Sequence, residues 1–89
     1  MNQELSELIT QMVNTKIEGQ MFFYENKIQL FVRTQEEKIK EIENIIKEKG
    51  YRECVKIKEE NMITKIYKKE EKVISIIEKE KNTEINIYY

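Results

Sequence analysis

The stretch that decides the fold is residues 21–33, which read MFFYENKIQLFVR. Two apolar runs flank Glu25-Asn26, and Asn tolerates the positive φ that a two-residue hairpin turn requires. If Tyr24 lies opposite Lys27, strand alternation decides which side chains share a face. The predicted core face carries Met21, Phe23, Ile28, Leu30 and Val32. The opposite face carries Phe22, Tyr24, Gln29 and Phe31. The sequence thus predicts a β-hairpin with aromatic side chains pointing away from the core.

A helical pattern precedes the hairpin. Its apolar residues recur at offsets of three and four, which places them on one face of an amphipathic helix. These residues are Leu5, Leu8, Ile9, Met12, Val13 and Ile17. Asn2 can act as the N-cap, and Gly19 is expected to end the helix.

A second helical pattern follows the hairpin and is closed by Gly50. Thr34 at the N-cap and Glu37 three residues later predict a capping box, in which two backbone donors find side-chain acceptors. The expected buried stripe consists of Ile39, Ile42, Ile45 and Ile46. Glu36 and Lys40 can pair across one turn on the solvated face.

After the second helix, Ile-, Val- and Tyr-rich runs alternate with polar turns, as strands do. The predicted strands cover residues 51–58, 62–68, 72–78 and 83–89. A long helix over residues 61–82 is the alternative, but strands are favoured because β-branched residues dominate and turn residues interrupt the run. We therefore expect an α+β fold: an N-terminal helix, a β-hairpin, a second helix, and an antiparallel meander of three to four strands in one sheet.

Composition bounds the size and the chemistry of the protein. A chain of 89 residues is expected to form a single domain over residues 1–89. Charged residues make up 37%, but the net charge is only −1, so no strong field steers the protein toward nucleic acid or anionic lipid. The chain has no His, no Asp and no Gly-rich phosphate loop. We expect neither an enzyme nor a metal or cofactor site, because the usual acid–base, nucleophilic and zinc-binding groups are missing.

Cys54 is the only cysteine, so an internal disulfide is not possible. Its simplest interpretation is a small, half-buried hydrophobe on a strand. No run approaches the about 18 apolar residues of a membrane span, and residues 1–4 lack the character of a signal peptide. A cytoplasmic protein in a reducing compartment is therefore expected.

Two features predict a surface for protein binding. Phe22 and Phe31 each cost about 1.5 to 3 kcal/mol if left in water, so either the first helix or another chain should cover them. The C-terminal strand is expected to form a flat sheet edge without Pro, which invites strand addition and dimerisation. The predicted interaction residues are Phe22, Tyr24, Phe31, Ile85, Ile87 and Tyr89.

A basic face is predicted if the first two meander strands pair with each other. Its residues would be Arg52, Lys56, Lys58, Lys65, Tyr67 and Lys69. Some domains bind single-stranded RNA with a basic, aromatic-bearing sheet face. Glu59, Glu60, Glu70 and Glu71 lie at the same edge, so a solvated Lys/Glu face is the preferred interpretation and nucleic-acid binding is not expected.

The order of elements resembles the roadblock/LC7 (longin-like) fold family. Residues 17–23, IEGQMFF, look like that family's entry into its first strand, and residues 51–78 are similar to its three-strand meander. The resemblance implies a non-catalytic module that dimerises and serves small Ras-like GTPases or transport complexes. The turn Glu25-Asn26 and the strand-like tail depart from the family pattern.

The sequence therefore predicts a homodimeric regulator or scaffold that binds another protein, without a cofactor. One alternative is a small virus- or mobile-element-encoded inhibitor of a host defence protein, similar in role to anti-CRISPR proteins. A second alternative is a nucleic-acid-binding protein that uses the basic face.

Overall fold

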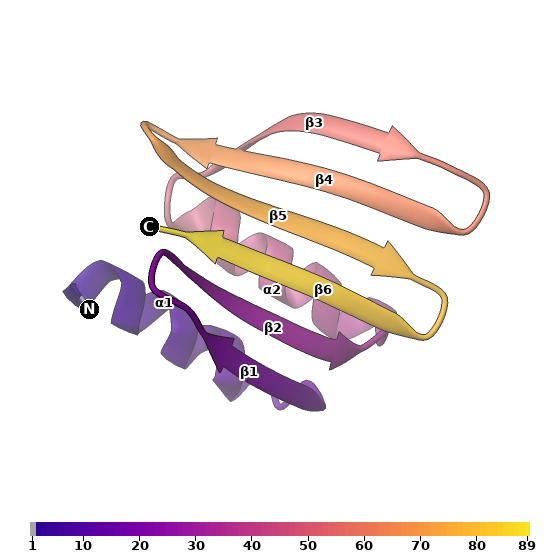
Figure 1. Ribbon diagram of the computed structural model, residues 1–89, viewed down its shortest axis with the longest axis horizontal. Coiled ribbons are helices and arrows are strands. Elements are labelled where there is room, and N and C mark those ends of the chain that lie inside the picture. Colours follow the sequence, from indigo (N-terminus) through magenta and orange to yellow (C-terminus); the bar gives the residue numbers. More distant parts are fainter. Residues whose placement is uncertain (1) are drawn as a thin grey trace.

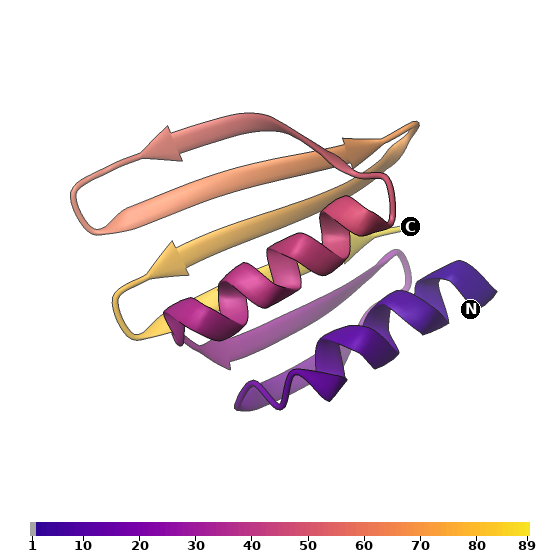
Figure 2. The same ribbon diagram turned by 180° about the vertical axis from the view of Figure 1, so that it is seen from behind.

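Six antiparallel strands form one sheet in the computed structural model, which describes residues 2–89, and two helices pack on one face of that sheet (Figures 1 and 2). The helices are α1 (Gln3–Asn14) and α2 (Glu36–Glu48). The strands are β1 (Gly19–Phe23), β2 (Lys27–Arg33), β3 (Arg52–Lys58), β4 (Met62–Lys69), β5 (Lys72–Lys79) and β6 (Asn82–Tyr88). The predicted α+β order is confirmed, and residues 61–82 form strands rather than a helix.

The sheet order β1-β2-β6-β5-β4-β3 places the C-terminal strand in the middle. Strand β6 pairs with β2 on one side and with β5 on the other. The predicted C-terminal edge is therefore wrong, and β1 and β3 are the two edges. Because β6 is central, its Ile85 and Ile87 are 0% and 1% exposed beneath the helices, so neither belongs to an exposed interaction surface.

The hairpin has the predicted register. The Tyr24 backbone N–H donates to the Lys27 carbonyl over 2.9 Å, and Phe23 lies opposite Ile28. Neither Glu25 nor Asn26 has a positive φ, so the turn does not use the conformation expected of Asn.

The ends of α1 only partly follow the sequence signals. Asn2 is the N-cap, and its Oδ1 accepts a 2.7 Å hydrogen bond from the Leu5 backbone N–H, as predicted. The helix ends at Asn14, and the chain turns at Lys16, which has a φ of 61°. Gly19 lies instead in β1, where an added Cβ would sit 2.4 Å from the Phe31 carbonyl oxygen. The glycine thus permits a close approach of β1 to β2 rather than a helix end.

Helix α2 is closed as predicted but begins differently. Gly50 has a φ of 97°, and its backbone N–H donates to the Lys47 carbonyl in the turn that ends the helix. The N-cap is Gln35, without a side-chain hydrogen bond, so the predicted capping box does not form. The Thr34 hydroxyl bonds instead to the Lys79 carbonyl (2.7 Å) and to the Thr83 hydroxyl (2.8 Å), which ties the start of α2 to the β5–β6 turn.

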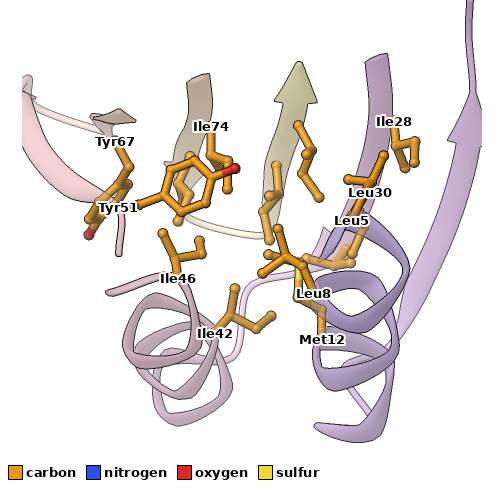
Figure 3. Close-up of a cluster of buried hydrophobic side chains, with 14 residues drawn as sticks. Leu5, Leu8, Met12, Ile28, Leu30, Ile42, Ile46, Tyr51, Tyr67 and Ile74 are labelled. Carbon is orange, nitrogen blue, oxygen red and sulfur yellow. The ribbon is translucent and has the colours of Figure 1, made fainter. Parts of the chain in front are cut away.

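The core lies between the helices and the central strands (Figure 3). Leu5, Leu8 and Met12 of α1 point into it beside Ile42 and Ile46 of α2. The sheet supplies chiefly Ile28, Leu30, Val32, Tyr67, Ile74, Ile76, Ile85 and Ile87. Two residues that were predicted on apolar faces are exposed. Phe23 is 62% exposed, because it ends an edge strand that only partly enters the core, and Val13 of α1 is 53% exposed.

Ile42 tests the position of α2. The side chain is fully buried, so Ile42→Ala should lower the free energy of unfolding by about 2 to 5 kcal/mol through lost apolar contact and the cavity left behind. Urea denaturation measures this loss. Lys40→Ala, two residues earlier on the solvated face of α2, is the control and should change stability by less than about 0.5 kcal/mol.

Candidate interaction surfaces

Among residues 2–89, no helix or strand covers the face of the sheet opposite the helices (Figures 1 and 2). We call it the open face. Register places its side chains in rows that cross the strands, and its members include Phe22, Gln29, Phe31, Val55, Ile57, Ile66, Ser75, Ile77, Glu84, Asn86 and Tyr88, with Tyr24 beside it. Phe31 is 43% exposed near the middle of β2. The sequence analysis expected either the first helix or another chain to cover these aromatic residues. The structure excludes the first helix, because both helices lie on the other face of the sheet.

Hydrogen bonds hold the tyrosines at one end of the open face. The Tyr89 hydroxyl donates to the Tyr24 carbonyl over 3.1 Å, and the Tyr89 backbone N–H donates to the Asn26 carbonyl. Lys27 Nζ lies 5.2 Å from the ring centre of Tyr24 and 5.8 Å from that of Tyr88, within the range of cation–π attraction. These contacts hold the exposed rings in defined positions on the surface.

A polar strip crosses the middle of the open face. Glu84 accepts hydrogen bonds from Gln29 Nε2 (2.7 Å) and from Asn86 Nδ2 (3.2 Å), and the same Asn86 nitrogen also donates to Ser75 Oγ. Asn86 is 3% exposed, and its Oδ1 has no hydrogen-bond partner among residues 2–89. A buried acceptor without a hydrogen bond costs about 1 to 3 kcal/mol.

The predicted basic face does not assemble. Tyr67 is 0% exposed beneath α2, and its hydroxyl donates to Glu43 Oε2 over 2.5 Å. Lys65 Nζ donates to the same carboxylate oxygen over 2.8 Å. Helix α2 thus covers Tyr67, so a nucleic-acid base cannot stack on this ring as the basic-face prediction required.

A β-bulge divides the remaining basic residues between the two faces of the sheet. The register shifts between Glu53 and Val55, so Arg52 lies in the open-face row of Lys68. Lys56 and Lys58 stay on the helix side, on an edge strand that is exposed along its length. Cys54, at the bulge, is exposed rather than half-buried, and its Sγ contacts the Ile66 carbonyl over 3.4 Å.

Lys69, the last member of the predicted basic face, belongs to an ion-pair cluster at the C-terminal end of α2. Its Nζ lies 2.8 Å from Glu4 Oε1 and donates to the Lys49 carbonyl over 2.7 Å. Lys72 Nζ lies 3.0 Å from Glu4 Oε2. The cluster links the start of α1, the end of α2 and the β4–β5 hairpin, so Lys69 serves the fold.

The two networks shift the pKa values of their members. Hydrogen bonds from Lys69 and Lys72 lower the pKa of Glu4 to about 2. Burial raises the pKa of the Tyr67 hydroxyl, and the hydrogen bond to the Glu43 carboxylate raises it further. For Lys65, burial opposes the charge, but the hydrogen bond and the negative charge of Glu43 prevail and the pKa is raised. Tyr67 thus remains a neutral donor and Lys65 a cation at neutral pH.

No group of three Cys or Glu side chains within residues 2–89 is close enough to hold a metal ion. No helix in the same range is long and apolar enough to cross a membrane. Two exposed features were not predicted from the sequence. Phe23 was assigned to the core, and the free edge of β1 depends on the order of the strands, which local sequence patterns do not contain.

Comparison of the chain with protein-family models, with curated proteins and with solved structures finds no match. The resemblance to the roadblock/LC7 family therefore stays a prediction. What the structure defines is a small α+β domain with a six-stranded antiparallel sheet that is covered on one face only.

The Glu43 network should contribute to stability through Tyr67. Tyr67→Phe removes a hydrogen bond to a charged acceptor while keeping the ring in the core, so unfolding should become easier by about 1.5 to 3 kcal/mol. Urea denaturation checks this value. Tyr24→Phe loses only an exposed 3.4 Å contact and should leave the midpoint unchanged. Equal midpoints for both variants would contradict the role given to Glu43.

The Glu4 cluster should make stability depend on pH in the acid range. The folded pKa, about 2, lies below the ordinary value of 4.5, so the stabilisation is complete above pH 4.5 and is lost as pH falls toward 2. Glu4→Gln should therefore melt at a lower temperature than the parent at pH 7, and the gap should close near pH 2. Added salt should also narrow the gap at pH 7, because the side chain is 40% exposed. Melting curves across pH and salt concentration test both effects.

Proposed function

We propose that this protein is a non-catalytic protein-interaction module that docks a protein partner on its open face. The observation that carries the proposal is the one-sided cover of the sheet, which leaves Phe22, Phe31 and Tyr88 exposed on one face. Exposed aromatic residues dominate protein interfaces because they bury a large area at low entropic cost.

The distribution of polarity supports a protein partner. Apolar side chains lie on both sides of the strip formed by Gln29, Glu84 and Asn86. An apolar surface with a few ordered polar groups can bind a partner and also set the register of binding. The strip itself contains a carboxylate and no cation, and Arg52 lies with two lysines of the open face in the row of Tyr88 beside it. A carboxylate at the centre of the face does not suit the phosphates of a nucleic acid.

The nucleic-acid alternative has lost most of its support, because Tyr67 is buried and Lys65 and Lys69 are engaged by carboxylates. A regulatory scaffold for a small GTPase and an inhibitor of a host defence protein both need an exposed docking face. The two differ in the partner, so identifying the bound protein separates them.

Site-specific photocrosslinking in the producing cell tests the proposal. A photoreactive phenylalanine analogue replaces Phe31 in one variant, Tyr88 in a second and Lys40, on the solvated side of α2, in a third. The first two should form a covalent adduct with the same foreign polypeptide, identified by mass spectrometry, and the third should not. Adducts with nucleic acid, or equal labelling from Lys40, would contradict a docking role for the open face.

Phe31→Lys tests whether the Phe31 side chain contributes to binding of the partner. The side chain is 43% exposed on the uncovered face, so the substitution should leave the melting temperature of the protein unchanged. Phe31→Lys is combined with the photoreactive residue at position 88. The partner then loses apolar contact worth about 1.5 kcal/mol or more, so the yield of the adduct from position 88 should fall about tenfold. An undiminished adduct would remove Phe31 from the docking surface.

A further inference from the structure

The two edges of the sheet differ in how they are protected. Strand β3 carries Arg, Glu and Lys residues and a β-bulge, which are the usual devices against edge-to-edge pairing. Strand β1 reads GQMFF, with no charge, no Pro and no register shift against β2. It is therefore the unprotected edge of the sheet.

The hydrogen-bond pattern shows which backbone groups of β1 are free. The Arg33 N–H donates to the Glu18 carbonyl, and the Tyr24 N–H donates to the Lys27 carbonyl. Because inward and outward residues alternate along an antiparallel strand, Gln20 and Phe22 also face β2. The N–H and C=O groups of Gly19, Met21 and Phe23 therefore point away from the sheet.

These three outward residues are spaced symmetrically about Met21. We propose that β1 pairs antiparallel with β1 of a second copy of this chain, with Met21 on the two-fold axis. Met21 then lies opposite Met21 of the second copy, and Gly19 lies opposite Phe23. All six outward backbone groups find partners in this register, and no like charges meet across the axis.

The side chains complement each other in the same register. An apolar groove between α1 and the edge of β1 is lined by Met12, Val13, Ile17, Gly19, Met21 and Val32. Phe23 of the second copy, on the helix side of the sheet and opposite Gly19, would enter this groove. A cross-strand aromatic ring over an edge glycine is a favourable arrangement, because the glycine leaves room for the ring. Each copy offers one ring and one groove, as a two-fold interface requires.

The exposed area sets the expected strength of the dimer. Phe22, Phe23 and Tyr24 are 40%, 62% and 48% exposed, and complete burial of an aromatic side chain removes about 150 to 250 Å². Even with the groove residues included, the pair falls at the small end of specific interfaces, which typically bury about 1,200 Å² or more. We therefore infer a dimer that forms and dissociates with protein concentration.

Antiparallel pairing about this axis keeps the helices of both copies on one side and joins the two open faces on the other. The inference adds to the proposed function but does not depend on it, since it uses the β1 edge and leaves Phe31 and Tyr88 free. Photocrosslinking to a foreign protein and self-association can each succeed or fail alone.

Sedimentation equilibrium over a range of concentrations tests the dimer. The parent should shift from the mass of one chain to that of two, and Phe23→Pro should weaken the association at least tenfold, because each copy loses an outward donor and its ring. Lys56→Pro, at an outward N–H of the charged edge, is the matched control and should dimerise like the parent. A mass of one chain at the highest soluble concentration, or equal dimerisation of both proline variants, would overturn the proposal.

Disulfide crosslinking tests the register without relying on proline. In a Cys54→Ser background, Met21→Cys brings two thiols together across the axis at a Cα separation of about 5.5 Å, which a disulfide can bridge. Gln20→Cys places the two thiols about two residues out of register, beyond reach. Oxidation should give a covalent dimer for Met21→Cys alone. A dimer from Gln20→Cys but not from Met21→Cys would exclude the proposed axis.

Discussion

Strand β6 hydrogen-bonds to β2 on one side and to β5 on the other, and this double pairing makes one sheet out of two local units. The N-terminal hairpin and the C-terminal meander would otherwise be separate. With β6 in place, the alternating isoleucine, leucine and valine side chains of β2, β6 and β5 form a continuous apolar surface for α1 and α2. The buried positions of Ile85 and Ile87 follow from this central place, as does the assignment of β1 and β3 to the edges.

The same arrangement leaves the second face of the sheet without cover. Two helices of 12 and 13 residues are both needed on one side, because the core they close extends from β2 to β4. The chain has no third helix among the described residues, so the aromatic side chains of β1, β2 and β6 remain in contact with solvent. The proposed docking role depends on this ordered face, which exposes large apolar side chains and holds some of them in place.

Charge serves the fold more than recognition in this protein. Lys65 and Lys69, which looked like free cations, are each held by a carboxylate from a helix, and Glu43 also orients the buried Tyr67. The two clusters lie along α2 and link it to β4. On the open face the polar groups instead bond among themselves, and Asn86 keeps an acceptor without a partner among the described residues. Polar side chains thus bind the helices to one face of the sheet, whereas on the open face the Asn86 Oδ1 atom has no hydrogen-bond partner among the described residues.

The sequence by itself determined the local elements of this protein. The capping of α1 by Asn2, the hairpin register at Tyr24 and Lys27, the apolar stripe of α2 and the strands of the meander follow from the periodicity of nearby residues. It also identified Phe22, Tyr24 and Phe31 as a face in need of cover, because alternation alone assigns them to one side of the hairpin. Local spacing carries this information since the hydrogen bonds of helices and hairpins join residues close in the chain.

Only the tertiary structure decided the order of the strands, the free edge and the fate of the basic residues. The pairing of β2 with β6 joins residues 49 to 61 positions apart, and its register is set by burial rather than by a turn. The bulge at Cys54, the carboxylates that hold Lys65 and Lys69, and the exposure of Phe23 all depend on which segments meet in space. For the candidate surface, the sequence therefore pointed to the aromatic residues, while the packing of both helices on one face decided that no part of the described chain covers them.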